Sequence, residues 1–220
     1  FAFKNKIEVK IKEDISKNIN AKVDWKDYGL GLFKNFPNFS LSLDELNVVG
    51  VDSFANDTLA NIKSINVAID LMSVIRGSNY KIKKINLDEP NILLKVLKSG
   101  KANWDITKPS ETSTTEEESS DFKLALQQVN IKKGNLVYED QSLDMRIDAV
   151  NLNGSLKGDM TIDVTTLNTK STIEFLTFAY GGINYLSKIN SEVTATIEAD
   201  LKNSKYTFKE NEFRLNNLFL

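Results

Sequence analysis

The fold is decided by a short stretch that occurs twice in the chain. Residues 85–94 read INLDEPNILL, and residues 129–138 read VNIKKGNLVY. The two copies align without a gap, since each has an apolar-Asn-apolar triplet, two polar residues, Pro or Gly, an Asn and three apolar residues. The alternation predicts a half-buried strand, and Pro90 or Gly134 in its middle predicts a tight turn or a bulged bend. The stretch therefore indicates two copies of one strand-bend-strand unit.

Alternation with a period of two continues on both sides of this repeat. It begins after Asp24 and is typical of half-buried strands. The alternating sets are Leu41, Leu43, Leu46 and Val48; Ile65, Val67, Ile69 and Leu71; Met160, Ile162 and Val164; and Val193, Ala195, Ile197, Ala199 and Leu201. Turn-forming residues are found at 132–135, 153–154, 157–159, 181–182 and 202–204. The pattern predicts a mostly antiparallel β-structure with a minor helical part.

Helix is expected in only two places. Residues 4–20 carry an Ile at every fourth position from Ile7 to Ile19, which predicts an amphipathic helix, although Ile7, Val9 and Ile11 also alternate as in a strand. The apolar stripe is narrow and has no Trp or Phe anchor, which favours packing on a sheet over lying on a membrane surface. The second candidate is residues 71–76, which Gly77 would end.

The composition excludes several classes of protein. The 220 residues contain no Cys and no His, so disulfides, thiolate or imidazole zinc sites and Ser-His or Cys-His catalysis are excluded. The apolar runs are far shorter than the roughly 20 residues that a membrane-spanning helix needs. A formal net charge of -2 gives no electrostatic reason to bind nucleic acid. We therefore expect no catalytic residues, no metal and no cofactor.

Two groups of carboxylates offer weaker alternatives. Asp140 and Asp144 could form the acid pair of a glycosidase, but their polar, turn-rich surroundings favour an exposed loop. Residues 108–121 read KPSETSTTEEESSD and contain no apolar residue, which predicts a disordered acidic loop. The acids at 116–118 are consecutive, whereas a calcium-binding loop needs spaced ligands.

The predicted strands leave an apolar face that the predicted helices are too few to cover. Two arrangements satisfy such a sheet. It can close on itself as a sandwich or barrel, or it can leave an apolar concavity that a ligand, a lipid or further chain fills. The periodicity alone does not choose between them.

Several segments resemble the AsmA family of Gram-negative bacteria in their order and spacing. They include GLGLFKNFPNFSLSLDELNVVG at 29–50, ANIKSINVAIDLMSVIRG at 60–77, IKKINLDEPNILLKV at 82–96, and a Gly-x-x-Asn-Trp-Asp motif at Gly100, Asn103, Trp104 and Asp105. VNIKKGNLVYED at 129–140 and EFRLNNLFL at 212–220 are similar to later strands of the family. The resemblance implies a periplasmic protein anchored to the inner membrane and related to the chorein-like lipid-transfer proteins with repeating β-grooves.

With this resemblance, we expect one β-groove region over residues 1–220, which forms a large curved antiparallel sheet with an open apolar groove and one N-terminal amphipathic helix. We expect the chain to be a fragment of a longer protein, with the helix at 1–20 following a membrane anchor. The ten residues expected to line the groove are Val67, Ile69, Ile85, Leu87, Ile92, Leu94, Val129, Ile131, Leu136 and Tyr138. Asn66, Asn86 and Asn130 are expected on the opposite face.

The expected function is non-enzymatic. The protein would bind or conduct a phospholipid or another acyl lipid between the inner and outer membranes and would support outer-membrane assembly. The alternative is a structural or assembly factor for outer-membrane proteins that acts through protein contacts and carries no lipid. The expected partners of the protein are lipid, the membrane and envelope proteins, but not nucleic acid.

Overall fold

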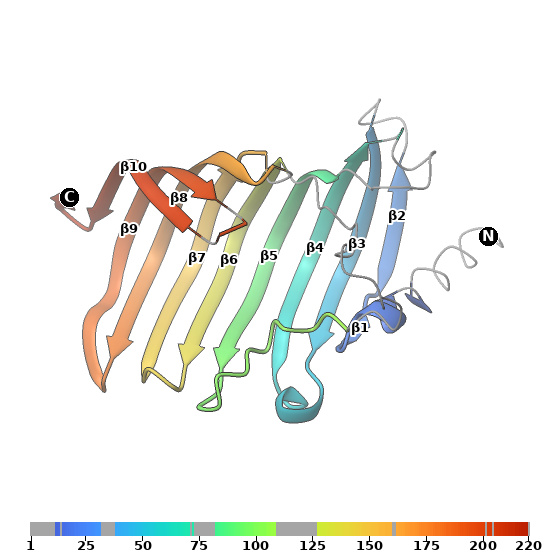
Figure 1. Cartoon of the computed structure of the whole chain (residues 1–220), viewed down its shortest axis with the longest axis horizontal. Helices are drawn as coiled ribbons and strands as arrows, with labels where there is room; N and C mark the ends of the chain where they lie inside the picture. The colour runs from blue at the N-terminus through green and yellow to red at the C-terminus, as the bar shows by residue number, and fades with distance from the viewer. Residues whose placement is uncertain are drawn as a thin grey trace.

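Eleven strands form one sheet in the part of the chain that the structure describes (Figure 1). The computed structural model describes residues 12–13, 15–31, 38–70, 72, 82–108, 127–159, 162–200, 202–203 and 205–219. The strands are β1 (Lys22–Asp24), β2 (Asp27–Gly31), β3 (Asn38–Val49), β4 (Thr58–Asp70), β5 (Ile82–Val96), β6 (Gln128–Asp140), β7 (Met145–Lys157), β8 (Val164–Tyr180), β9 (Ile183–Asp200), β10 (Lys205–Leu215) and β11 (Leu218–Phe219). A short 3-10 helix, η1 (Asp52–Phe54), lies between β3 and β4. The mostly β fold with a large, open and curved sheet is confirmed.

The strands follow one another across the sheet in chain order from β3 to β11. Both β1 and β2 pair with β3, so these two short strands form the first edge of the sheet. All neighbouring pairs are antiparallel except one: β5 and β6 are parallel. The expected antiparallel sheet therefore has one exception, and it falls at the sequence repeat.

The two copies of the repeat lie side by side as this parallel pair. Ile85 is opposite Val129, Leu87 is opposite Ile131 and Ile92 is opposite Leu136, which is the ungapped alignment of the two sequences. Equivalent residues of the two copies therefore become neighbours. Asn130 Nδ2 donates to Asn86 Oδ1 at 2.7 Å, and Asn135 Nδ2 donates to Asn91 Oδ1 at the same distance.

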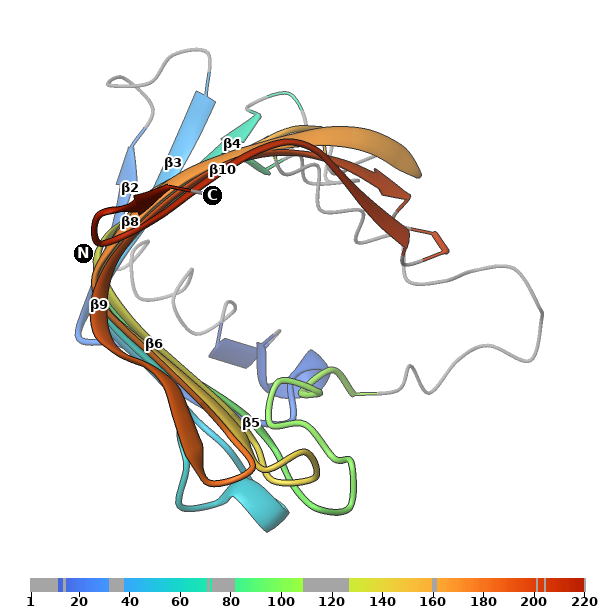
Figure 2. The same cartoon turned by 90° about the vertical axis from the view of Figure 1, so that its left-hand side faces the viewer.

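A line of β-bulges bends the sheet across its strands. Non-glycine residues with φ between 48° and 53° are found in or beside six strands: Glu45 in β3, Glu89 in β5, Lys133 in β6, Asn151 in β7, Lys188 in β9 and Asn216 after β10. The register shifts by one or two residues beside several of them. Bulges bend a strand and increase its twist, and the sheet curves into a C-shaped cross-section (Figure 2). Of the two alternatives at Pro90 and Gly134, the bulged bend is therefore the one observed.

Two of the expected turns are wrong. Residues 132–135 lie inside β6, and residues 153–154 lie inside β7. Lys133 forms a bulge in place of a turn, and Gly154 approaches β8 so closely that an added Cβ would lie 2.7 Å from Ser171 Cβ. The turns at 181–182 and 202–203 join β8 to β9 and β9 to β10, and Gly158 lies in the connection after β7.

The expected helices are described only in part. Residues 12–13 and 15–18 are helical, and the helix has ended at Ile19, which bridges to Thr107. Residues 4–11 lie outside the described residues. Of the expected helix at 71–76, only Met72 is described, and it is helical. Of the expected acidic loop at 108–121, only Lys108 is described.

A small buried cluster lies at the first edge of the sheet, and Leu167 of β8 and Ala195 and Ala199 of β9 are buried farther along it. Trp25, Tyr28, Leu46 and Ile62 form a buried cluster, and Ile15 of the helix packs against it. The helix lies inside the curve of the sheet, so the cluster is on the concave side (Figure 2). No helix in the described ranges is long and apolar enough to cross a membrane.

Candidate functional site

All ten residues expected to line a groove lie on one face of the sheet. Cross-strand partners share a face, and the register joins Val67, Ile85 and Val129 in one row and Leu87 and Ile131 in the next. Ile92 pairs with Leu136, Leu94 pairs with Tyr138, and Ile69 pairs with Ile82. Leu87 packs against the same cluster as the helix residue Ile15, so this is the concave face. We call the surface formed by these rows the concave face.

The bulges keep the apolar residues on this face. In an unbroken strand, Leu87 and Ile92 would point to opposite faces, because side chains alternate with a period of two. The bulge at Glu89, with φ 48°, shifts the alternation so that Leu87 and Ile92 point to the same face. The bulge at Lys133, with φ 51°, does the same for Ile131 and Leu136. The sequence shows this as a change from odd to even numbering of the apolar positions.

The concave face is neither closed nor fully exposed. Each of the ten residues is half-buried. A closed sandwich would bury the side chains between its two sheets almost completely. The described strands therefore form the open alternative, with apolar side chains in partial contact with solvent.

The opposite, convex face is polar along the same strands. Asn66 is exposed, and Asn86 and Asn130 are hydrogen-bonded to each other, as their alternation with the apolar rows predicts. Lys63 Nζ lies 2.8 Å from Glu89 Oε1 across the bend, and this pair raises the pKa of Lys63 and lowers that of Glu89. At these positions the two faces differ in chemistry, although Leu93 and Val137 form an apolar pair farther along the convex face.

The first end of the concave face, at β1–β4, is covered by the chain itself. Trp25 is only 6% exposed, and Lys12 Nζ lies 4.8 Å from the centre of a Trp25 ring. Beside them, a pocket of about 520 Å³ lies between the helix and β1 and β3. Sequence reasoning missed Trp25, although its alternation with Val23 places it on the apolar face.

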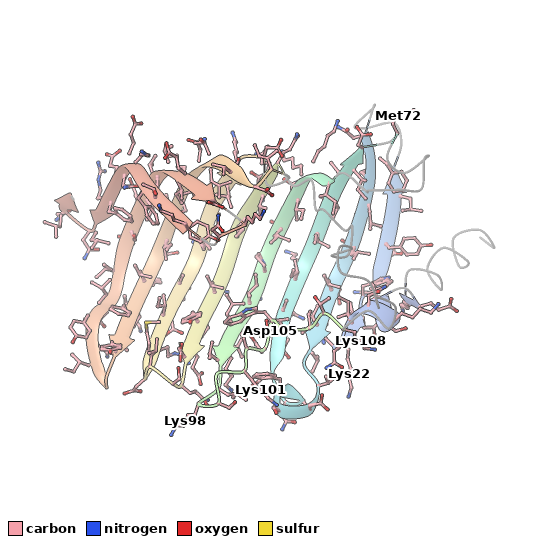
Figure 3. All side chains as sticks on the ribbon, viewed as in Figure 1. Lys22, Met72, Lys98, Lys101, Asp105 and Lys108 are labelled. Carbon is pink, nitrogen blue, oxygen red and sulfur yellow. The ribbon has the colours of Figure 1, made fainter. Side chains whose placement is uncertain are left out.

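A strap, residues 101–108, crosses the concave side from the end of β5 to the helix (Figure 3). Asn103 holds its start, because its side chain accepts from Lys95 N at 2.8 Å and donates to Leu93 O at 2.7 Å. Thr107 bridges to Ile19. Between them, the ring of Trp104 lies 6.2 Å from the ring of Tyr138. The Gly-x-x-Asn-Trp-Asp motif therefore places an aromatic ring over a residue expected to line the groove.

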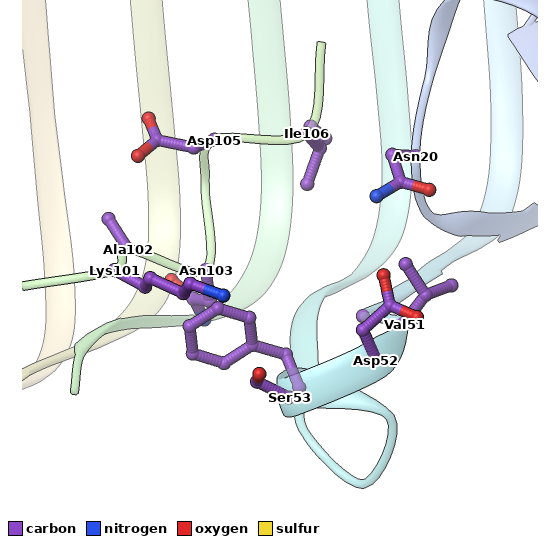
Figure 4. Close-up of a pocket in the computed structure, with 11 residues that line it drawn as sticks. Asn20, Val51, Asp52, Ser53, Lys101, Ala102, Asn103, Asp105 and Ile106 are labelled. Atoms are coloured by element: carbon purple, nitrogen blue, oxygen red, sulfur yellow. The ribbon is translucent and has the colours of Figure 1, made fainter. Parts of the chain in front are cut away.

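A second, smaller pocket lies where the strap meets η1 (Figure 4). Its volume is about 230 Å³, and its lining includes Asp52, Lys101 and Asp105. The lining is polar and of mixed charge, and it lies at the rim, away from the apolar rows. We assign it no ligand.

The other end of the concave face carries exposed aromatic residues that sequence reasoning also missed. Tyr206, Phe208 and Phe213 of β10 pair with Ala199, Ile197 and Val193, so they continue the concave rows. Tyr206 and Phe208 are 54% and 57% exposed. A bulge between Phe208 and Asn211 changes the phase of the alternation, which hid the set in the sequence.

The carboxylates considered as a glycosidase pair organise a turn. Asp140 Oδ1 accepts from the Ser142 hydroxyl at 2.6 Å and from the backbone N–H groups of Ser142 and Leu143. These hydrogen bonds, the Ser142 hydroxyl foremost, lower the pKa of Asp140 against the opposing effect of burial. Asp144 is exposed in the same turn, with φ 49°. Within the described ranges, no three carboxylates converge as metal ligands would.

Comparison with known proteins gives one match. A family model described as the AsmA family matches residues 2–212, which is nearly the whole chain. No curated protein and no solved structure matches the chain. The resemblance seen in the sequence is therefore confirmed at the level of the family.

Proposed function

This chain belongs to the AsmA family, and we propose that it binds acyl lipid on the concave face and helps to move lipid between the inner and outer membranes. The observation that carries the proposal is the set of continuous apolar rows whose members are only half-buried. Membership of the family is consistent with a role in the cell envelope and in outer-membrane assembly. The proposal includes a periplasmic location and an anchor in the inner membrane.

The dimensions of the sheet suit an extended acyl chain. Neighbouring strands lie about 4.8 Å apart, so a row that crosses from β3 to β9 extends over about 29 Å. This is close to the roughly 30 Å hydrocarbon thickness of a whole bilayer, and a single acyl chain spans about half of that. A lipid chain can therefore lie along a row, across the strands, with each buried methylene contributing about 0.8 kcal/mol.

The proposed activity needs no chemistry beyond burial and release. The concave rows supply aliphatic and aromatic side chains, and the carboxylate of Asp140 is used within its own turn. We therefore propose a non-enzymatic protein without a cofactor, with lipid, membrane and envelope proteins as partners and without nucleic acid.

The direct test places a charge among the apolar rows. In Ile69→Asp, the carboxylate would lie in the path of an acyl chain, and lipid retained by the purified protein should fall at least tenfold. Because Ile69 is half-buried, the melting temperature should change little. Leu87→Asp should also lose lipid, with a larger drop in melting temperature, because Leu87 packs against the buried cluster. Native mass spectrometry after detergent-free purification measures the lipid.

The matched control is Asn66→Asp, which adds the same charge to the exposed convex side of the same strand. It should keep both lipid and stability. If the parent protein retains no lipid, or if all three variants retain as much as the parent, the proposal is wrong.

One observation favours the second candidate, an assembly factor that acts through protein contacts. On its outer side, β10 pairs with β11 only at Arg214 and Leu215, so the rest of that edge has no strand partner in the described part of the chain. A free edge can accept a strand from another protein. Envelope proteins captured by the parent but lost with a Pro substitution at Thr207 would support this candidate, provided that lipid is absent.

A further inference from the structure

The indole N–H of Trp25 is buried and has no hydrogen-bond partner among the described residues. Trp25 belongs to an apolar cluster with Tyr28, Leu46 and Ile62, and Ile15 packs against it. Buried polar groups are almost always hydrogen-bonded, because an unpaired donor loses its bond to water without replacing it. The first end of the concave face therefore holds a donor that lacks an acceptor.

Positive charge lies beside this donor. Lys12 Nζ lies 4.8 Å from the centre of a Trp25 ring and 3.3 Å from Asp24 Oδ1. The adjoining pocket of about 520 Å³ is lined by apolar Ile15, Val23 and Val49 and by Lys12, Lys22 and Asp24. Among the described lining residues, two lysines stand against one aspartate, so these side chains are suited to an anionic group.

We propose that this end of the concave face is the site for the polar head of an anionic glycerophospholipid. The Trp25 N–H donates to an ester or phosphate oxygen, and Lys12 leaves Asp24 to pair with the phosphate. The acyl chains continue along the concave rows. This inference rests on the proposed function and adds to it a lipid class, an orientation and a donor.

The site needs Lys12 to move away from Asp24. The Lys12–Asp24 pair is largely exposed, with side-chain exposures of 42% and 79%, so it contributes little to stability. Movement of Lys12 uncovers the face of the indole ring on which it lies. The helix remains held, because Ile15 stays on the cluster and Ile19 stays bridged to Thr107.

The first experiment measures the affinity of the full chain for phosphatidylglycerol vesicles. Trp25→Phe keeps an aromatic ring but removes the donor, and its affinity should fall about tenfold, as expected for the loss of a hydrogen bond to a charged or strongly polar acceptor. Lys12→Gln should weaken binding to phosphatidylglycerol more than to phosphatidylcholine. Trp104→Phe, which removes the exposed indole of the strap, is the matched control and should change the affinity less.

The second experiment measures orientation. In the Trp104→Phe background, Trp25 is the only Trp, because the chain contains two. Its fluorescence should be quenched more strongly by phosphatidylglycerol brominated at carbons 6 and 7 than by the same lipid brominated at carbons 11 and 12, because the head end lies beside Trp25.

The outcomes separate this inference from the proposed function. If the parent binds lipid, Trp25→Phe binds it equally well and the two brominated lipids quench equally, then the proposed head-group site is wrong while lipid binding stands. A raised melting temperature in that variant would show that the N–H is only an unsatisfied buried group. If the parent binds no phospholipid, both proposals fail together.

Discussion

The two ends of the concave face belong to the same sheet but differ in how far their large apolar side chains are buried. At the β1–β4 end, the helix covers the face, and Trp25, Tyr28, Leu46 and Ile62 are buried. At the β10 end, Tyr206, Phe208 and Phe213 continue the same rows and are exposed. The first end thus has a buried cluster of large apolar side chains, whereas β10 presents large apolar side chains to solvent beside the small, buried Ala199. The strands at both ends carry apolar side chains in the same rows. The helix that packs on the sheet, and not the strand pattern, therefore decides where large side chains are buried.

The side chains along one row change between these ends. Leu43, Ile65, Leu87 and Ile131 occupy four successive positions, and the row then continues through Gly154 and Ser171. Branched side chains in the first half provide apolar area. Small side chains in the second half let the backbones approach closely, as the 2.7 Å from an added Gly154 Cβ to Ser171 Cβ shows. The first half is therefore the better place for an acyl chain.

The largest expected effect comes from one charge placed at each end. Ile62→Asp buries an unpaired carboxylate in the cluster and should lower the free energy of unfolding by at least about 3 kcal/mol. Phe208→Asp changes an exposed side chain and should lower it by less than about 1 kcal/mol. Urea unfolding of both variants measures the difference. Equal losses would mean that the β10 end is as well packed as the helix-covered end.

Equal backbone strain in the middle of the sheet and toward its exposed end gives a second, smaller contrast. Lys133 in β6 and Lys188 in β9 both have φ 51°, a conformation that a β-branched residue strongly disfavours. Lys133→Val should cost about 1–2 kcal/mol of unfolding free energy, because the bend there is fixed by buried Pro90 and Gly134. Lys188→Val should cost less, because β9 can relax locally at its exposed bend.

The control for this pair is Lys132→Val, beside the bulge and outside the positive-φ set, which should change stability by less than about 0.5 kcal/mol. Chemical denaturation compares all three variants. A larger loss at Lys188 than at Lys133 would contradict the prediction that β9 relaxes more easily than β6.

The repeat shows how much of the fold can be predicted from the sequence. The ungapped match of residues 85–94 to 129–138 predicts two equivalent strand-bend-strand units, and the structure contains them as β5 and β6. Their parallel pairing could not be predicted, because it depends on the path of the long connection between them and not on the strands. Lys133 and Gly154 misled the turn assignment for a related reason. Bulges and close strand approaches use the same residues as turns.

The sequence identifies the residues of the concave face where apolar and polar residues alternate regularly, and it fails where the alternation is short or shifted. Val67, Ile85 and Val129 share one row as their pattern predicts, and their contact with lipid stays a prediction. Trp25 was missed because it alternates only with Val23 of the short β1, and two positions are too few to establish a period. The β10 aromatics were missed because a bulge shifts their phase. A search that allowed one shift per strand would have found Phe208 and Phe213.

The smallest expected effect concerns two carboxylates that each end a strand, Asp140 at the end of β6 and Asp200 at the end of β9. Hydrogen bonds lower the pKa of both: the Ser142 hydroxyl first for Asp140, and the Asn203 side chain first for Asp200. A lowered folded-state pKa means that the unfolded chain binds more protons, so the stabilisation is present above the ordinary carboxyl value of about 3.9 and is lost as the pH falls below it. Thermal unfolding from pH 6 to pH 3 should therefore show a falling melting temperature.

Asp140→Asn should lower the melting temperature at pH 6 by a few degrees and make the fall shallower, because Asp140 is buried among its donors. Asp200→Asn should do the same to a smaller extent, because its turn lies at the exposed end, where local opening is expected to precede global unfolding. A steeper fall with pH in either Asn variant would contradict the sign, and a larger effect at Asp200 would contradict the order of the two ends.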